Sequence, residues 1–205
     1  VLSVERREGD TPWQRTQIGI ADRANLMGQT PFVVWLTGLS GAGKSTIADL
    51  LDRKLHALGR HAMVLDGDNL RQGLNSDLGF SEADRSENVR RVGEVAALMA
   101  DAGLIVIVSL ISPFRQDRAR ARDAAGSHRF LEVFVDAPLE VCRQRDPKGF
   151  YARAEAGSLK RFTGIGSGYE PPEAPDLHLH TDRMSAADAV DLVLATLRER
   201  SINTG

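Results

Sequence analysis

The chain has 205 residues, of which 42% are hydrophobic, so it is long enough for one domain with a sizeable core. Its formal net charge of −2 gives no overall attraction to nucleic acid or to an anionic membrane, and we expect neither as a partner. The one cysteine excludes an internal disulfide framework and a cysteine-rich zinc site, and it favours a reducing compartment. Because no signal-peptide pattern and no membrane-spanning apolar run occurs, the sequence predicts a cytoplasmic protein.

Residues 1–30 are charged and irregular and have little hydrophobic periodicity. We therefore expect an N-terminal arm or linker there, followed by one domain over residues 31–205. The chain begins with Val1 instead of Met, which fits either a trimmed chain or a domain cut from a longer polypeptide. The sequence does not separate these two readings.

Five strand-length segments of apolar or alternating residues follow, at residues 32–36, 61–66, 104–110, 130–136 and 176–181. Segments with helical spacing lie between and after them, at residues 46–58, 81–102, 114–125 and 185–200. Two helix starts carry a serine followed three positions later by an aspartate, which predicts capping boxes at Ser81 with Asp84 and at Ser185 with Asp188. Strands that alternate with helices predict an α/β fold with a parallel sheet covered by helices on both faces.

The stretch "GLSGAGKS" at residues 38–45 fits the pattern G-x-x-x-x-G-K-[ST]. It follows an apolar strand and opens a helix, as a phosphate-binding loop requires, and this context disfavours a glycine-rich turn that binds nothing. Lysine in this pattern reaches the β- and γ-phosphates, and the serine hydroxyl binds Mg²⁺. The pattern thus predicts ATP and Mg²⁺ as cofactors, with a nucleotide-binding set of Gly38, Ser40, Gly41, Ala42, Gly43, Lys44, Ser45 and Thr46.

A nucleotide site alone does not establish a kinase, and a nucleotide-controlled switch or interaction module is the alternative from another class. The sequence contains no Asn-Lys-x-Asp motif for reading guanine, although residues 123–126 match the weak D-x-x-G pattern. Adenine is therefore the favoured base, and a GTP switch is disfavoured.

Two carboxylates end the second predicted strand, in "LDGDNLR". Asp66 and Asp68 should lie at the same sheet edge as the phosphate loop, because ligands of open α/β sheets gather at the carboxyl ends of the strands. One of them can accept the proton of an attacking hydroxyl, and either can hold Mg²⁺. We assign Asp68 as the catalytic base and, with Ser45, as a metal ligand; helix or turn capping by both aspartates is the alternative.

Two arginines and an amide follow this strand. Arg85 and Asn88 are three residues apart on one helix face, and Arg71 precedes them. Guanidinium groups bind phosphate or sulfate through two parallel hydrogen bonds, so the set suits a doubly anionic ligand. Phe80 supplies an aromatic face on which a base can stack.

Four separated motifs resemble the adenylyl-sulfate kinase family: "WLTGLSGAGKSTIA", "LDGDNLRQGLNSDLGFSEADRSENVRRVGEVA", "SLISPFRQDR" and "DPKGFYARAEAGSLKRFTGIGSGYEPP". The resemblance runs from about Asp22 to the last helix. It implies a P-loop kinase fold with a mobile lid, ATP and Mg²⁺ as cofactors, and adenosine 5′-phosphosulfate (APS) as the acceptor of a phosphoryl group on its ribose 3′-hydroxyl. The product would be 3′-phosphoadenosine 5′-phosphosulfate (PAPS), in sulfate assimilation. The family also suggests a homodimer and a fusion to, or association with, ATP sulfurylase.

By this resemblance, the substrate-binding set comprises Asp66, Arg71, Phe80, Arg85, Asn88, Ile111, Ser112, Lys148, Leu159 and Phe162. Arg145 joins the nucleotide-binding set, and Lys44, Asp68 and Ser112 are the catalytic candidates. Ser112 matches a serine that the family describes as a phosphoserine intermediate. Direct in-line attack by the acceptor needs no covalent step, so we favour a hydroxyl that hydrogen-bonds the substrate.

Residues 146–172 are rich in Gly, Lys, Arg and Pro without a clear period, which predicts a mobile lid. Its closure would bring Arg145, Lys148 or Lys160 toward the phosphates and exclude water. The lid reads "GIGSGYE" where the family often has an acidic residue or proline, so Ser167 and Gly168 imply added flexibility. A P-loop kinase for another small hydroxyl substrate and a nonenzymatic ATP-binding regulatory module stay open as alternatives.

Three further features are interpreted as structural. His178 and His180 alternate on the last strand and could share a metal, but with no third ligand nearby in sequence an ordinary partly buried pair is favoured over zinc. Residues 117–123, "DRARARD", are expected to be a solvated helix face, although Arg118 could approach the acceptor site. Trp35 is expected to be structural.

Overall fold

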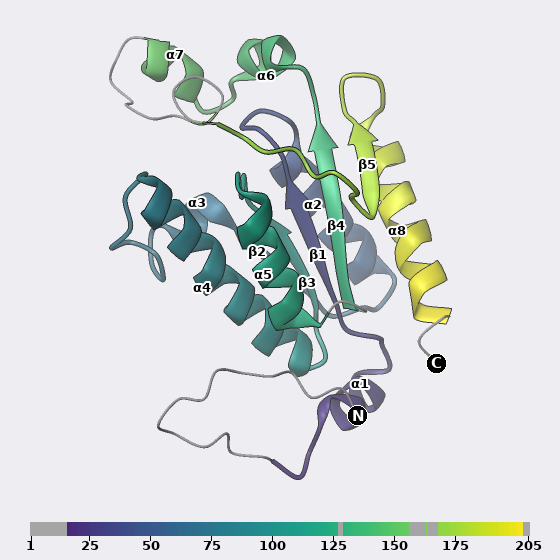
Figure 1. Cartoon of the computed structure of the whole chain (residues 1–205). Helices are drawn as coiled ribbons and strands as arrows, with labels where there is room; N and C mark the ends of the chain where they lie inside the picture. Colours follow the sequence, from purple (N-terminus) through teal and green to yellow (C-terminus); the bar gives the residue numbers. More distant parts are fainter. Residues whose placement is uncertain (1–15, 127–128, 156–162, 164–167, 203–205) are drawn as a thin grey trace.

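Five parallel strands form one sheet in the computed structural model, which describes residues 16–126, 129–155, 163 and 168–202. The strands are β1 (Phe32–Thr37), β2 (Ala62–Asp66), β3 (Ile105–Ser109), β4 (Phe130–Asp136) and β5 (Leu177–His180). The helices are α1 (Ile20–Met27), α2 (Lys44–Ala57), α3 (Gly67–Leu70), α4 (Glu82–Asp101), α5 (Arg115–Ala125), α6 (Leu139–Arg145), α7 (Phe150–Glu155) and α8 (Ala186–Ile202). All five predicted strands and the four predicted helices are present, and Figure 1 shows their arrangement.

The strand order is β2-β3-β1-β4-β5, and every neighbouring pair is parallel. The register places Leu36 of β1 opposite Ser109 of β3, which in turn lies opposite Asp66 of β2. From β1 the chain crosses past β3 to reach β2, and after β3 it crosses back past β1 to reach β4. The order therefore reverses between β1 and β3, and ligands of open α/β sheets bind at the carboxyl ends of the strands beside such a reversal.

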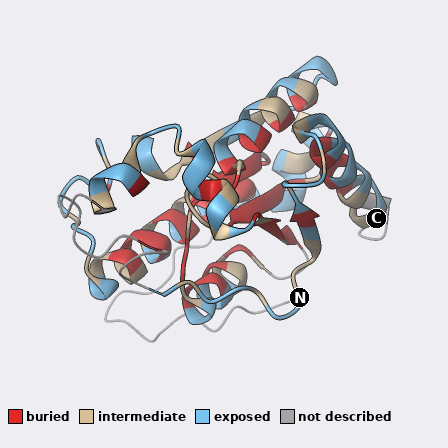
Figure 2. Cartoon of the chain, turned by 90° about the horizontal axis from the view of Figure 1, so that it is seen from above, coloured by how far each residue is buried: buried red, intermediate tan, exposed pale blue. Residues whose placement is uncertain are grey.

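Helices cover both faces of the sheet, as predicted. One core joins α2 and α8 to the inward side chains of β1, β3 and β4, and the other joins α4 and α5 to the alternate side chains of the same strands. Trp35 belongs to the second core and stacks on Phe130 with ring centroids 5.6 Å apart, so its predicted structural role is confirmed. Figure 2 shows the buried strands between helices whose outer surfaces are exposed. Burial of one large apolar side chain here contributes about 1.5–3 kcal/mol.

The predicted capping box at Ser81 forms, and at Ser185 the hydroxyl contact of the predicted box is present. The Ser81 hydroxyl accepts the backbone N–H of Asp84, and the Asp84 carboxylate accepts the backbone N–H of Ser81. At the last helix the Ser185 hydroxyl accepts the backbone N–H of Asp188 at 3.1 Å. These contacts satisfy donors that the first turn of a helix leaves without an intrahelical partner.

The end of the predicted N-terminal arm is more regular than expected, because residues 20–27 form α1. None of the residues of α1 is buried, which explains why hydrophobic periodicity did not reveal it. Gln29, just after it, is buried and donates through its side chain to the carbonyl oxygens of His61 and Gly103. The arm is thereby joined to the amino-terminal edge of the sheet, opposite the phosphate loop (Figure 1). Within the described part of the chain, no helix has the length and apolar character that crossing a membrane requires.

Candidate functional site

The phosphate loop between β1 and α2 needs glycine at two positions for steric reasons. Gly38 has φ 150° and Gly41 has φ 78°, both in a region that side chains rarely adopt. A Cβ atom on Gly38 would lie 2.1 Å from the carbonyl oxygen of Val135, and one on Gly41 would lie 2.6 Å from that of Cys142. The loop is therefore packed against the end of β4 and against α6, which fixes where its backbone N–H groups point.

Lys44, the first residue of α2, lies folded back over this loop. Its ammonium group donates to the carbonyl oxygens of Gly38 at 2.9 Å and Leu39 at 2.7 Å. Burial lowers the pKa of Lys44 to about 8, although the nearby charges of Asp66 and Asp68 oppose that shift. A buried ammonium group that donates to backbone carbonyl oxygens is well placed to receive an anionic phosphate group.

Asp66 lies beside the serine that the sequence pattern assigns to Mg²⁺. The Ser45 hydroxyl donates to the Asp66 carboxylate at 2.9 Å and lies 3.3 Å from the Ser109 hydroxyl. Asp66 also caps α3, because its other oxygen accepts the backbone N–H of Asp68 at 3.0 Å. The capping alternative is thus correct for Asp66, and it coexists with a cluster of oxygen atoms beside the loop. Such hard oxygen donors are the ligands that suit Mg²⁺.

Asp68 makes a different contact, an ion pair with Lys148 from the segment between α6 and α7. Its carboxylate is half exposed, and its hydrogen bond to Lys148 raises the pKa of the Lys148 ammonium group. The first aspartate of "LDGDNLR" therefore contacts Ser45 of the phosphate loop, and the second contacts Lys148. Sequence alone did not separate these two positions.

The phosphate loop and the predicted acceptor residues line one cavity of about 530 Å³. Its lining includes Ser40, Gly41, Gly43, Lys44, Ser45, Thr46 and Arg145 of the predicted nucleotide set, and Asp66, Asp68, Arg71, Phe80, Arg85, Asn88, Ile111, Ser112 and Lys148. Gly38 and Ala42 are not among its lining residues: Ala42 is buried, and the Gly38 carbonyl is bonded to Lys44. The predicted Leu159 and Phe162 lie outside the described residues, as do Lys160 and Ser167.

Arg71 and Phe80 form one side of the acceptor part of this cavity. The Arg71 guanidinium lies 4.5 Å from the centroid of the Phe80 ring and donates to the carbonyl oxygens of Leu78 and Gly79. Phe80 keeps 53% of its surface exposed, although exposure of a large aromatic ring is costly. The ring is thus available for stacking on a flat ligand.

Arg85 and Asn88 are buried on α4 and line the same cavity as this pair. Arg85 donates to the carbonyl oxygen of Phe80 at 3.1 Å and to the hydroxyl of Thr163. Asn88 accepts a hydrogen bond from the Asn75 side chain at 2.9 Å. Burial lowers the pKa of Arg85, with the neighbouring Arg71 charge acting in the same direction. Two arginines that repel each other across a cavity favour an anionic ligand between them.

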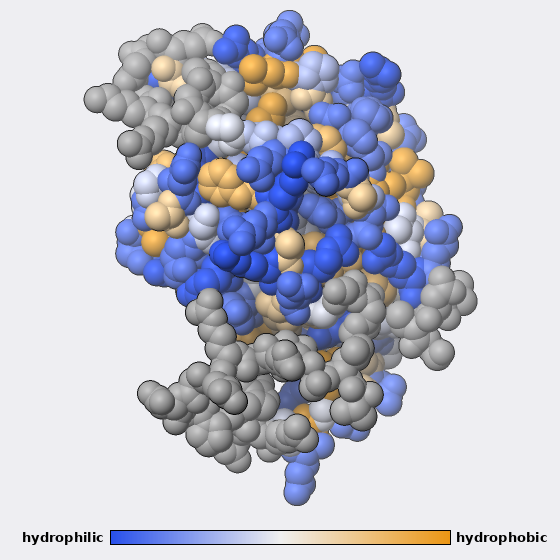
Figure 3. All heavy atoms as spheres, in the orientation of Figure 1, coloured by the Kyte–Doolittle hydropathy of each residue, from blue (hydrophilic) through white to orange (hydrophobic). Residues whose placement is uncertain are grey.

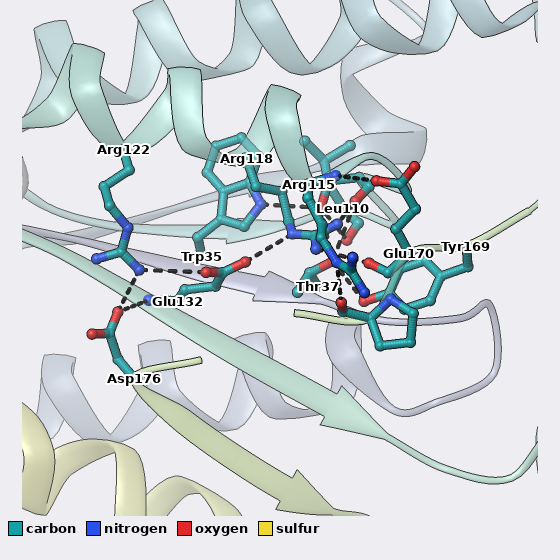
Figure 4. A network of polar contacts seen from close by, with 12 residues as sticks. Trp35, Thr37, Leu110, Arg115, Arg118, Arg122, Glu132, Tyr169, Glu170 and Asp176 are labelled. Atoms are coloured by element: carbon teal, nitrogen blue, oxygen red, sulfur yellow. Dashed lines mark hydrogen bonds and ion pairs between the residues drawn. The ribbon is translucent and has the colours of Figure 1, made fainter. Parts of the chain in front are cut away.

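Ser112 is buried and has φ 41°, a strained value for a residue that is not glycine. Its hydroxyl accepts a hydrogen bond from the Trp35 indole at 3.1 Å and donates to the Thr37 hydroxyl at 3.0 Å. Thr37 also lies 3.0 Å from the phenol oxygen of Tyr169, and Figure 4 shows Trp35, Thr37 and Tyr169 as parts of one network of polar contacts. These contacts hold the Ser112 hydroxyl against the sheet end.

Part of the predicted lid is fixed to the core. The backbone N–H of Glu170 donates to Pro113, and Arg118 donates to the carbonyl oxygens of Ser112 and Glu170 (Figure 4). Arg118 is 2% exposed and pairs with Glu132 of β4 at 2.7 Å. The expectation of a solvated face for residues 117–123 is therefore wrong on this side of α5. Because Arg118 is not among the cavity-lining residues, it supports the loop that carries Ser112 instead of reaching the acceptor.

Arg145 and Thr181 lie on the nucleotide side. Arg145 donates to the carbonyl oxygen and hydroxyl of Thr181 at 2.7 Å and 3.3 Å, and to the carbonyl of Gly41 at 3.4 Å. Sequence reasoning missed Thr181, Ser109 and Thr163 as lining residues. In the structure Ser109 ends β3 and Thr181 directly follows β5, so the rule that ligands gather at strand ends was the signal that could have found them. Thr163 lies within the predicted lid and carried no such signal.

The adenylylsulphate kinase family matches this chain over residues 30–180. The adenylyl-sulfate kinase of Aeromonas hydrophila subsp. hydrophila is 54% identical over 188 residues, which make up 92% of this chain and 95% of the relative. The bifunctional enzyme NodQ of Rhizobium sp. (strain N33) is 56% identical over 202 residues, which make up 98% of this chain and 31% of NodQ. The chain thus spans less than a third of this longer relative.

Among solved structures, the Mycobacterium tuberculosis APS kinase CysC in complex with AMPPNP and APS is similar with a TM-score of 0.79 and 52% identity, over 82% of this chain and 98% of that chain. A gluconokinase from Sinorhizobium meliloti 1021 has a TM-score of 0.56 at 20% identity, over 85% of this chain and 95% of that chain, and shares the fold alone. The predicted P-loop kinase fold is confirmed. On the strength of these matches and of the lined cavity, this chain belongs to the adenylylsulphate kinase family.

Proposed function

We propose that this chain transfers the γ-phosphoryl group of ATP to the ribose 3′-hydroxyl of APS and so produces PAPS and ADP. The observation that carries the proposal is that one cavity is lined both by the phosphate loop and by Arg71, Phe80, Arg85 and Asn88. The first set suits a nucleotide triphosphate, and the second suits a flat base that carries a phosphosulfate group. The AMPPNP and APS complex of the Mycobacterium tuberculosis relative supports this pairing of ligands.

Phosphoryl transfer of this kind relies on positioning and on stabilisation of negative charge. Lys44 and the loop amides hold the phosphates of the donor, and Arg71 and Arg85 hold the acceptor's anionic groups. Asp68 orients the acceptor hydroxyl and accepts its proton. The ion pair between Asp68 and Lys148 places an ammonium group beside the proposed base. There it accompanies the negatively charged phosphoryl group as that group passes from ATP to the acceptor hydroxyl.

The oxygen cluster of Ser45 and Asp66 fits a Mg²⁺ ion, because carboxylate and hydroxyl oxygens are its preferred protein ligands. The ion supplies charge neutralisation between the phosphates when it is bound. We assign its protein contacts to Ser45 and Asp66. Asp68, which was expected to bind the ion together with Ser45, is not assigned to it because its carboxylate is paired with Lys148. Asp68 is retained as the base that orients the acceptor hydroxyl.

Two other functions remain as alternatives. A kinase for another small hydroxyl substrate would share the phosphate loop, but it would not require Arg71, Arg85, Asn88 and Phe80 around one cavity. A nonenzymatic module would bind ATP without turnover. It gives no reason for Asp68 to line the cavity as an ion pair with Lys148.

The test measures ADP formation from MgATP with and without APS and identifies the nucleotide product by mass. We expect ADP release that depends on APS, with PAPS as the second product. Arg85→Ala should lower the APS-dependent rate of ADP formation by tenfold or more, which is the effect expected from losing a charged hydrogen bond. Arg90→Ala, a change of an exposed arginine on the same helix that pairs with Glu87, is the matched control and should leave the response unchanged.

Three results would count against the proposal. ATP binding without any APS-dependent ADP would favour the nonenzymatic module. ADP release with another hydroxyl compound but not with APS would favour a different acceptor. An equal loss in Arg85→Ala and Arg90→Ala would remove the acceptor role of Arg85.

We also propose that the domain acts as part of a bifunctional assembly, fused to or associated with ATP sulfurylase, since NodQ of Rhizobium and CysN/CysC of Xylella fastidiosa are named bifunctional enzymes. A homodimer stays a proposal, and the relative from Thiobacillus denitrificans is hexameric. The cytoplasmic location is likewise proposed, from the single buried thiol of Cys142.

A further inference from the structure

Two histidines and an aspartate meet at the carboxyl ends of β4 and β5, outside the lining of the cavity described above. The parallel register places Asp136 opposite His180 and Phe134 opposite His178. Because strand residues two apart point to the same face, both imidazoles project on one side of the sheet while Leu179 is buried on the other. The third ligand that the local sequence lacked is thus supplied by a neighbouring strand, at a sequence distance of 42 residues from His178.

The three side chains converge on a single point. His178 Nε2 lies 2.9 Å from the Asp136 carboxylate oxygen Oδ2, and His180 Nδ1 lies 3.6 Å from the same oxygen. One ligand atom from each residue falls within 4.8 Å of the others. A tetrahedral Zn²⁺ ion with bonds of about 2.0–2.1 Å separates its ligand atoms by about 3.3 Å. Changes in these separations of a few tenths of an ångström to at most about 1.5 Å therefore bring the atoms to coordinating distances.

The imidazole rings are held in place by a row of aromatic contacts. The His178 ring stacks on Phe134 at a centroid distance of 4.7 Å, and Phe134 stacks on Tyr169 at 6.1 Å. The His180 ring lies 4.1 Å from that of His178. Rings restrained in this way lose little further conformational freedom on binding a ligand.

The cluster is open to solvent, so an ion can enter and retain water. The side chains of His178 and His180 are 40% and 50% exposed, and that of Asp136 is 34% exposed. Two nitrogen ligands and one carboxylate favour Zn²⁺, Co²⁺, Ni²⁺ or Cu²⁺ over Mg²⁺, which prefers oxygen ligands alone. An imidazole–carboxylate ion pair without a metal is the competing reading of the same three residues.

We propose that Asp136, His178 and His180 form a binding site for a divalent transition-metal ion that joins the edge strand β5 to β4. The residue after His180 extends this link to the phosphate loop. Thr181 donates its backbone N–H to the carbonyl oxygen of Asp136 at 2.9 Å, and its hydroxyl donates to the carbonyl of Ala42 at 2.7 Å. An ion that binds only the folded arrangement stabilises it by mass action, so the melting temperature rises with metal concentration.

The test titrates Co²⁺ and Zn²⁺ into the metal-stripped full chain, with no nucleotide or APS present. This choice keeps the result independent of the proposed kinase activity. We expect one Co²⁺ per chain with visible absorption from a nitrogen- and oxygen-ligated ion, displacement of Co²⁺ by Zn²⁺, and a higher melting temperature with Zn²⁺ but not with Mg²⁺.

Three variants remove one ligand each: His178→Gln, His180→Gln and Asp136→Asn. Each variant should weaken Co²⁺ binding by about tenfold or more. Loss of a residue that only hydrogen-bonds a metal ligand already has an effect of that size, and these variants remove the ligand itself. His56→Gln, which changes an exposed histidine of α2, is the matched control and should bind Co²⁺ as the wild type does. Metal-free melting temperatures check that each variant folds, and a variant that does not fold is replaced by His180→Ala.

The proposal is overturned if wild-type protein shows no saturable Co²⁺ binding. It is also overturned if His178→Gln and His180→Gln bind Co²⁺ as tightly as His56→Gln does. In either case the three residues form an ion pair and a ring stack only.

Discussion

The Ser45 hydroxyl donates a 2.9 Å hydrogen bond to the Asp66 carboxylate, so the phosphate loop after β1 contacts the end of β2, two strands away in the sheet. If this oxygen pair holds Mg²⁺, Asp66→Asn should raise the Mg²⁺ concentration for half-maximal rate by about tenfold or more, because one anionic ligand becomes a neutral amide. Asparagine is an equally good helix cap, so α3 should stay intact. The measurement is the rate as a function of free Mg²⁺ at saturating ATP.

Asp68→Asn serves as the control for that experiment. Asp68 contacts Lys148 and not Ser45, so the Mg²⁺ concentration for half-maximal rate should not change in this variant. Equal shifts in the two variants would contradict the division of roles between the two aspartates.

Asp68→Asn carries a prediction of its own. Loss of a positioned base should lower kcat by about a hundredfold or more while ATP affinity is retained. The ion pair with Lys148 joins two half-exposed side chains, so its loss should change the free energy of unfolding by no more than about 1 kcal/mol. Single-turnover kinetics and urea unfolding measure the two quantities. Full activity in Asp68→Asn would remove Asp68 from the mechanism.

The order of elements could be predicted from the sequence because hydrophobic alternation and helical spacing are local properties. All five strands, the four long helices and the two helix starts at Ser81 and Ser185 were found in this way. The exposed helix α1 and the short helices α3, α6 and α7 were not, since none of them presents a long apolar face. A repeating apolar face is what reveals a helix in a sequence, and single buried residues such as Cys142 of α6 and Tyr151 of α7 do not make one.

The candidate site was predicted where a motif carries its own chemistry, as in residues 38–45. The prediction of the site was incomplete where a contact depends on how strands or helices that are distant in sequence lie next to each other. The pairing of Ser45 with Asp66 follows from the strand order, and the pairing of Arg118 with Glu132 follows from the packing of α5 on β4. Neither arrangement leaves a local signal. For the same reason the run of charges around Arg118 was taken for a solvated face.

Ser112→Ala tests whether the serine forms a covalent intermediate. The Ser112 hydroxyl already accepts from Trp35 and donates to Thr37, and its strained backbone persists because these contacts hold it. We therefore expect activity within about tenfold of the wild type, since a phosphoserine is not required for in-line transfer. The free energy of unfolding should fall by about 1–3 kcal/mol, because the buried Trp35 N–H loses its acceptor.

Intact-mass analysis after mixing with MgATP completes this test. A chain heavier by one phosphoryl group in the wild type, absent in an inactive Ser112→Ala variant, would establish the covalent route instead. The predicted activity is measured with purified APS, and the predicted loss in the free energy of unfolding is measured by urea unfolding at the same pH.

Arg118→Ala tests the contribution of the buried cation beneath the Ser112 loop. The change leaves Glu132 without this partner and frees the carbonyl oxygens of Ser112 and Glu170, so the free energy of unfolding should fall by about 3–5 kcal/mol. Arg120→Ala, an exposed position on the same helix, should change it by less than about 0.5 kcal/mol. Chemical unfolding of both variants measures the difference. Comparable losses in the two would show that Arg118 is not a buried support of this loop.

The pKa of Lys44 gives MgATP binding a specific pH dependence. Burial lowers this pKa to about 8 in the free protein, so Lys44 is charged at pH 7 and mostly neutral at pH 9. Phosphate groups beside it favour the charged form and raise its pKa, so binding at pH 9 takes up a proton that binding at pH 7 does not. The affinity for MgATP should accordingly be about tenfold weaker at pH 9 than at pH 7.

Calorimetry in buffers of different ionisation enthalpy measures that proton uptake directly. Lys44→Arg is the matched control, because a guanidinium group stays charged over this pH range and its binding should involve no proton uptake. A wild type that binds MgATP equally well at pH 7 and pH 9, without proton uptake at either, would mean that Lys44 is not the titrating group that receives the phosphates. Proton uptake that persists in Lys44→Arg would assign it to another residue of the cavity.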